Sequence, residues 1–84
     1  MSALQVRYFA WLRERVGESS ETIESGAATV RDLVDELSAR EERYALAFAD
    51  LSAVRVALDE ELADLAAPLA GVREVAFFPP MTGG

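Results

Sequence analysis

The spacing of apolar residues changes along this chain, and the changes constrain its fold more than any other feature. Every second position is apolar over residues 4–8, which predicts a strand with one buried face. Apolar residues recur at helical spacing over residues 30–37, period two returns over residues 54–58, and residues 74–78 form a short apolar run that predicts a last strand. We therefore predict an α+β fold in which one principal helix packs across a mixed sheet of four to five strands.

Local signals predict where several elements begin and end. Residues 10–16 indicate a short helix that Gly17 ends in the left-handed conformation. Thr29 begins the principal helix, because its side-chain oxygen can accept a hydrogen bond from an amide of the first turn. Residues 19–23 are polar and partly β-branched, which predicts an exposed strand in a loose hairpin with the first one.

The second half of the chain contains shorter elements. Residues 44–51 are consistent with either a short helix or an irregular turn, and residues 61–63 are too short for more than an edge strand. Residues 65–69 include a proline and suit a loop or one tight helical turn. In the last strand, Val75 and Phe77 should point into the core.

Composition limits the kind of protein that this sequence encodes. A chain of 84 residues with 51% hydrophobic content forms one domain, which we assign to residues 1–80, with residues 81–84 as a flexible tail. Cysteine and histidine are absent, so the chain has no thiolate metal ligand and lacks the usual general base. These absences argue against a metal site and against a self-contained enzyme.

Charge and hydropathy indicate the surroundings and partners of the protein. The net charge of −7 disfavours binding to nucleic acid or to an anionic membrane. No apolar run reaches the length of about 18 to 20 residues that spans a bilayer, and no export signal opens the sequence, so we expect a cytoplasmic protein. All eight basic residues are arginine and lysine is absent. Genomic base composition explains this, or a chain whose C-terminus becomes an activated acyl group gains from having no side-chain amine that could attack it. Self-conjugation through lysine is therefore impossible.

The sequence closes on an apolar strand, two prolines and a diglycine. Gly83 and Gly84 have no Cβ, so they can pass through a channel too narrow for other residues. Pro79 and Pro80 restrict the base of this tail and lower the entropy that its insertion costs. We predict that the tail delivers its carboxylate into the active site of another protein and that Phe78 faces that partner, as does Met81.

Two other groups of residues allow a structural and a functional interpretation. Trp11 either covers the core or anchors an interface. The acidic run at residues 59–61 is most simply a solvated turn, because paired-carboxylate catalysis requires a pocket that nothing in the sequence indicates.

These motifs together resemble a known family. The opening at residues 6–10, the helix start at Thr29-Val30 and above all residues 74–84 resemble the ubiquitin-like β-grasp sulfur carriers. The Phe-Phe-Pro-Pro run favours the branch of molybdopterin synthase small subunits over the thiamine-pathway carriers. The chain departs from that branch at residues 70–74, where an Asp-Gly-Asp-Glu turn is common, and at Met81, where valine is usual.

The resemblance implies a chemistry for the tail. An ATP-using, ubiquitin-activating-type adenylyltransferase would adenylate Gly84, and a sulfur donor protein would convert it to a thiocarboxylate, a 1-thioglycine. The large subunit of molybdopterin synthase would then supply catalysis in a heterotetramer while Gly84 donates sulfur to a pterin precursor. Thr82 and Gly83 would thread the channel, and Phe78, Pro79, Pro80 and Met81 would contact the partner. The chain itself would bind no cofactor.

Two alternatives remain open at the level of sequence. The chain could modify other proteins through a bond from Gly84 to their lysines. It could also carry sulfur for the thiolation of tRNA or for thiamine synthesis. All three functions share activation of the C-terminal carboxylate and differ in what accepts the product.

Overall fold

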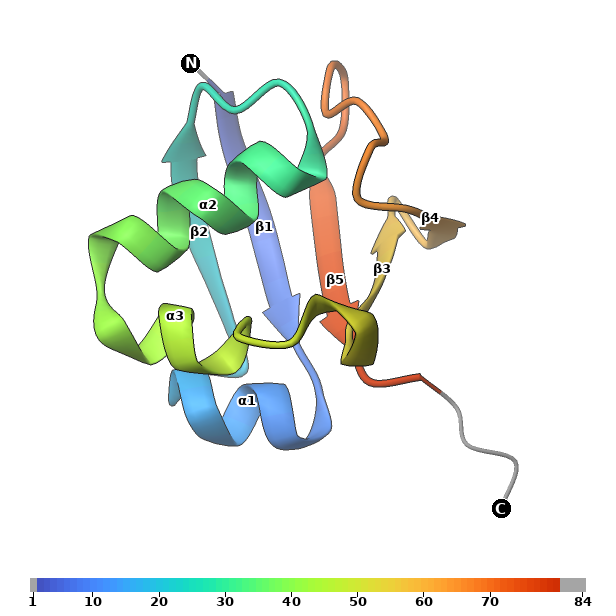
Figure 1. Ribbon diagram of the computed structural model, residues 1–84. Helices are drawn as coiled ribbons and strands as arrows, with labels where there is room; N and C mark the ends of the chain where they lie inside the picture. The colour runs from blue at the N-terminus through green and yellow to red at the C-terminus, as the bar shows by residue number, and fades with distance from the viewer. Residues whose placement is uncertain (1, 81–84) are drawn as a thin grey trace.

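The computed structural model describes residues 2–80, which form a five-stranded mixed sheet with its helices on one face and at one end (Figure 1). The strand order is β2-β1-β5-β3-β4; β1 and β5 are parallel and the other neighbours are antiparallel. The predicted α+β arrangement is confirmed, with five strands. The elements are β1 (Ser2–Tyr8), α1 (Ala10–Val16), β2 (Ser20–Ser25), α2 (Val30–Arg40), α3 (Glu42–Ala47), the 3-10 helix η1 (Leu51–Ala53), β3 (Arg55–Leu58), β4 (Glu61–Ala63) and β5 (Glu74–Phe78).

The first two strands pair as an antiparallel hairpin bridged by α1, as predicted. Gly17 ends α1 with a φ of 87°, which is the left-handed conformation expected of it. The prediction of an exposed second strand is only partly right, because β2 is an edge strand but Ile23 and Ser25 are buried. The hydroxyl of Ser25 donates to Glu36 of α2 at 2.9 Å, which shows that this side of β2 faces the helix.

Helix α2 begins as its capping sequence predicts. The Thr29 side-chain oxygen accepts a hydrogen bond from the amide of Asp32 at 3.2 Å. The apolar stripe of α2 is buried against the sheet, and each of its side chains contributes on the order of 1.5 to 3 kcal/mol before conformational entropy is deducted. The residues of this stripe are Val30, Leu33, Val34 and Leu37.

The region that the sequence leaves open, residues 44–51, folds as α3 followed by the start of η1. Phe48 is buried and its ring meets that of Phe77 edge-on, with 4.9 Å between centroids. Tyr8, the neighbour of Phe77 in the sheet register, stacks against the ring of Phe77 with 6.1 Å between centroids. Phe77 is therefore held between the sheet and the helical layer.

One carboxylate joins α3 to the sheet. Glu21 of β2 accepts hydrogen bonds from the hydroxyls of Tyr8 at 2.9 Å and Tyr44 at 2.6 Å. Burial and the hydrogen bond to Glu21 raise the pKa of Tyr44 to about 12 and raise the pKa of Tyr8 well above its usual range. Arg43 adds hydrogen bonds to Tyr44 at 3.0 Å and to the carbonyl of Val16 at 2.7 Å. The network thus ties β1, β2, α1 and α3 together.

The turn between β3 and β4 lies in left-handed backbone without a glycine. Asp59 and Glu60 have φ values of 49° and 73°, as a tight two-residue hairpin requires. The Asp59 carboxylate accepts hydrogen bonds from the amides of Arg73 at 3.1 Å and Glu74 at 2.9 Å. This acidic run is an exposed turn, in line with the structural interpretation, and it also holds the start of β5.

Candidate functional site

The residues expected to form the base of the tail lie at the end of β5, at the same end of the molecule as α1 (Figure 1). Phe78, Pro79 and Pro80 are half-buried. The remaining predicted site residues are Met81, Thr82, Gly83 and Gly84, and they lie outside the described residues. Their roles, and the boundary of the domain at residue 80, stay predictions.

Strand β5 anchors the base of the tail from both sides. It is the central strand, and its register places Phe77 opposite Tyr8 of β1 and Phe78 opposite Arg55 of β3. The amide of Phe9 donates to the carbonyl of Phe77 at 3.1 Å. Val75 and Phe77 are fully buried, which confirms their predicted place in the core. The point from which the tail departs is therefore fixed.

The sheet face opposite α2 is exposed and carries an apolar strip, which we call the open face. Side chains alternate along each strand, so the neighbours of buried positions point to this face. A row runs across it from Arg7 through Ala76 and Ala57 to Leu62, as the strand register shows. Leu62 is 78% exposed, which makes it the most exposed large apolar residue among those described.

Phe9 and Phe78 extend the open face toward the tail. Phe9 is 39% exposed, and the guanidinium of Arg7 lies 5.1 Å from the centre of its ring. Because Arg7 projects from the open face, this contact places the Phe9 ring on the same side. The sequence reasoning identified Phe78 and missed Phe9 and Leu62. Phe9 continues the alternation of β1 two positions after the exposed Arg7, which is a signal that the sequence contains, whereas Leu62 is placed on this face only by its register with Ala57.

Trp11 lies beside this end of the molecule and is half-buried against the core. The guanidinium of Arg15 covers its ring at 4.8 Å from the centroid. The interpretation of Trp11 as cover for the core agrees with this packing.

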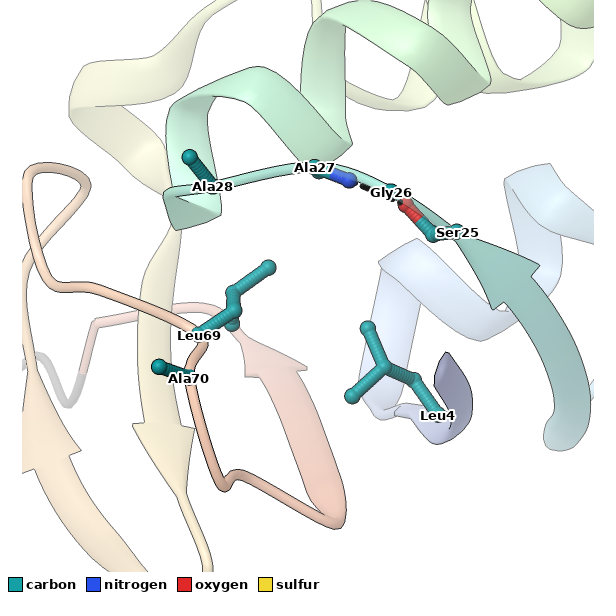
Figure 2. A pocket seen from close by; sticks show the side chains of 7 residues that line it. All are labelled: Leu4, Ser25, Gly26, Ala27, Ala28, Leu69 and Ala70. Carbon is teal, nitrogen blue, oxygen red and sulfur yellow. Dashed lines mark hydrogen bonds between the residues drawn. The ribbon is translucent and has the colours of Figure 1, made fainter. Parts of the chain in front are cut away.

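A hollow at the other end of the sheet offers no comparable chemistry (Figure 2). Its volume is about 290 Å³, and none of its lining side chains is charged. Its one polar side chain, Ser25, is already bonded to the amide of Ala27 and to Glu36. The lining residues are Leu4, Ser25, Gly26, Ala27, Ala28, Leu69 and Ala70.

Neither a metal site nor a membrane span was found in the described part of the chain. Across residues 2–80, no three His, Cys, Asp or Glu side chains gather closely enough to hold a metal ion. No helix in that range is long and apolar enough to cross a membrane. The open face and the anchored base of the tail combine exposed apolar residues with the end of β5 that leads to the diglycine.

Comparison with known proteins identifies the family. The model of the ThiS family matches residues 6–84. The chain belongs to the ThiS family. A member of known function, the molybdopterin synthase sulfur carrier subunit of Escherichia coli strain K12, is 37% identical over 81 residues, which cover 96% of this chain and 99% of that protein.

Solved structures of similar proteins confirm the ubiquitin-like β-grasp fold for this ThiS-family chain. SAMP1 from Haloferax volcanii superposes with a TM-score of 0.72 at 27% identity, over 99% of this chain and 100% of that one. A chain from the complex of subunits 1 and 2 of the molybdopterin-converting factor from Helicobacter pylori 26695 has a TM-score of 0.63 at 25% identity, with 99% and 100% coverage. The resemblance predicted from residues 74–84 is therefore confirmed over nearly the whole chain.

Proposed function

We propose that this ThiS-family protein is the sulfur-carrier subunit of a molybdopterin synthase. The observation that supports this most strongly is the 37% identity to the Escherichia coli carrier subunit over nearly the full length of both chains. The Phe-Phe-Pro-Pro run that leads into the diglycine supports the same branch of the family. Activation of such a carrier consumes ATP, so we propose the cytoplasm as its location.

The proposed chemistry takes place at Gly84. Its carboxylate oxygen attacks the α-phosphorus of ATP on a ubiquitin-activating-type enzyme, pyrophosphate leaves and an acyl adenylate forms. The terminal sulfur of a persulfide on a donor protein then attacks the acyl carbon, and AMP leaves. A second thiol reduces the resulting acyl disulfide, which releases the thiocarboxylate at Gly84 and leaves a disulfide between the donor cysteine and that thiol. The sulfur of this group displaces an oxygen leaving group from an activated carbon of the pterin precursor. Water then cleaves the resulting thioester, which regenerates the carboxylate and leaves the sulfur on the pterin as a thiolate.

The described residues position this chemistry without taking part in it. β5 is held by β1, β3 and the packing around Phe77, so the domain can dock while the tail extends from a fixed point. From Pro80 to Gly84, an extended chain spans about 16 Å at roughly 3.3 Å per residue. Such a tail reaches a buried site in a neighbouring subunit, and the two prolines at its base reduce the entropy lost on insertion.

The open face supplies the surface on which the partner sits. Phe9 and Phe78 lie next to the base of the tail on the side of the sheet that no helix covers, and Leu62 lies on the same side at the edge strand β4. Apolar residues at the centre of an interface contribute most of its binding energy. The large synthase subunit is the proposed partner, by analogy with the complex of subunits 1 and 2 from Helicobacter pylori, and two copies of each subunit would form the heterotetramer.

Intact mass spectrometry tests the proposed function. After incubation with ATP, the cognate activating enzyme and a sulfur donor, the chain should gain about 16 Da, the difference between sulfur and oxygen. A variant that lacks Gly84 is the control and should keep its fold without gaining mass. Absence of the gain in the full chain, with an activating enzyme that forms the adenylate, would contradict the proposal.

The same material distinguishes the alternative functions. Conjugation to lysines of other proteins would give heavier species that resist thiol reductants and disappear when Gly84 is deleted. If the loaded chain passes its sulfur to tRNA and none to the pterin precursor in the presence of the large subunit, the carrier role stands but the assignment to molybdopterin synthesis is wrong.

A further inference from the structure

Two arginines of the open face differ from most arginines of the helices in how they are paired. Arg55 has no carboxylate oxygen within 4 Å among residues 2–80, and Arg7 meets only Glu74, at 3.9 Å. That distance is too long for a hydrogen bond. Three helical arginines instead form ion pairs with N–O distances of 2.9 to 3.3 Å: Arg31 with Asp35, Arg40 with Glu36 and Arg43 with Glu41.

Arg7 and Arg55 lie on either side of the tail-bearing strand. Arg7 is opposite Ala76 in the sheet register, and Arg55 is opposite Phe78. Both are exposed and lie next to buried residues in their strands, so both project from the open face. The aromatic strip formed by Phe9 and Phe78 therefore has a cation on each side.

The acidic residues on this face do not neutralise both cations. Alternation places Glu74 of β5 and Glu24 of β2 on the open face, and Asp64, the residue after β4, lines the same hollow as Arg55. No nitrogen of Arg55 lies within 4 Å of a carboxylate oxygen of Asp64, whose Oδ1 accepts a hydrogen bond from the amide of Ala66 at 2.9 Å. Glu74 lies beside Arg7, whereas Glu24 is on the edge strand β2, which β1 and β5 separate from Arg55 on β3. Arg55 therefore has the larger unmet demand for a carboxylate.

These positions constrain any protein that covers the apolar strip. A partner that buries Phe9 and Phe78 also removes water from the adjacent guanidinium groups, and a desolvated charge without a counter-charge is costly. The net charge of −7 does not offset this cost of desolvation, because the overall negative charge of the chain repels a partner that is itself acidic. Attraction must come from local complementarity, in which bidentate carboxylates match the planar guanidinium.

We propose that the large subunit presents carboxylates to Arg7 and Arg55 on either side of an apolar centre that covers Phe9 and Phe78. This inference rests on the proposed function, since it specifies the surface of the partner that receives the tail. It defines the partner by a charge pattern: two acidic side chains set apart by the width of the three strands β1, β5 and β3.

The test measures binding of the full chain to the cognate large subunit by isothermal titration calorimetry at two salt concentrations. The variants are Arg55→Gln, Arg7→Gln and, as the matched control, Arg31→Gln, which makes the same change of charge on the helix across the opposite face. Circular dichroism melting verifies that each variant is folded. At low salt, we expect Kd to rise about tenfold for Arg55→Gln and about threefold for Arg7→Gln, because Glu74 already offsets Arg7. The control should stay within about twofold, since exposed pairs contribute little.

Salt and reversal of charge make the result decisive. The difference between Arg55→Gln and the control should shrink as salt rises from about 0.05 M to about 0.5 M, because screening weakens the ion pairs. Arg55→Glu, which reverses the charge, should weaken binding to the large subunit at low salt more than Arg55→Gln does. If the folded open-face variants bind as tightly as Arg31→Gln, the charge pattern is wrong while the proposed function stands. If the unmodified chain gains sulfur but does not bind the large subunit, the assignment of that partner fails, and this inference with it.

Discussion

The hairpin turn at Asp59-Glu60 predicts that one substitution has opposite effects at two adjacent positions. Glu60 has a φ of 73°, and the left-handed region costs a residue with a Cβ roughly 1 to 2 kcal/mol. Glycine avoids that cost but loses about 0.5 to 1 kcal/mol through the greater freedom of the unfolded chain. Glu60→Gly should therefore raise the free energy of unfolding by about 0.5 to 1 kcal/mol.

The matched control is Glu61→Gly. Glu61 begins β4 in extended backbone, so glycine brings no relief there and should lower the free energy of unfolding by about 0.5 to 1 kcal/mol. Both variants remove one exposed carboxylate from the same turn, so the general effect of charge cancels in the comparison. Both variants keep the hydrogen bonds that the Asp59 carboxylate accepts from the amides of Arg73 and Glu74 at the start of β5.

Thermal and urea unfolding followed by circular dichroism measure the difference. The two variants should differ by about 1 to 2 kcal/mol, which for a domain of this size separates their melting temperatures by roughly 5 to 10 °C, with Glu60→Gly the higher. Equal melting temperatures, or a higher one for Glu61→Gly, would refute the reasoning, because the left-handed turn would then carry no strain that glycine relieves.

Three further predictions concern the tyrosine network, the helix cap and the open face. The free energy of unfolding should fall as pH rises above about 10, because tyrosine in the unfolded chain then loses its proton while Tyr44 in the folded chain keeps its proton up to a pKa of about 12. In Tyr44→Phe this alkaline decline should be shallower. The same variant should lose about 1 kcal/mol of unfolding free energy at neutral pH, measured by urea unfolding. Thr29→Ala should lower the free energy of unfolding by about 1 kcal/mol, with Thr29→Ser close to the original, and equal values for the two would contradict the cap. Phe9→Ser should raise the Kd for the large subunit by about tenfold or more. The control Leu46→Ser changes an exposed apolar residue of α3 and should leave the Kd unchanged. If calorimetry shows the same loss of affinity for both variants, the open face is not the docking surface.

Local chemistry is what the sequence predicts best. The cap at Thr29, the left-handed Gly17 and the alternation that buries Val75 and Phe77 all depend on neighbouring residues, and the structure confirms each of them. The tail motif likewise indicated the family without structural help, because its residue types lie together in the sequence.

Contacts between distant segments were harder to predict. Residues 44–51 remained ambiguous because α3 is joined to the sheet by a hydrogen bond from Tyr44 to the distant Glu21, which a local pattern cannot reveal. The sequence of β2 suggests an exposed strand because most of its residues are polar, yet Ile23 and Ser25 alternate with them and are buried on the side that faces α2. The exposed apolar residues Phe9 and Leu62 become a candidate interface only when the sheet register places them on the same face as Phe78.

The central place of β5 has a consequence for which molecules can serve as carriers. Its neighbours β1 and β3 come from opposite halves of the chain, so the middle of the sheet closes only when the last strand inserts between them. An incompletely folded chain possesses the diglycine but lacks the aligned surface beside it. Recognition through the open face would thus let the large subunit select only those chains whose folding is complete.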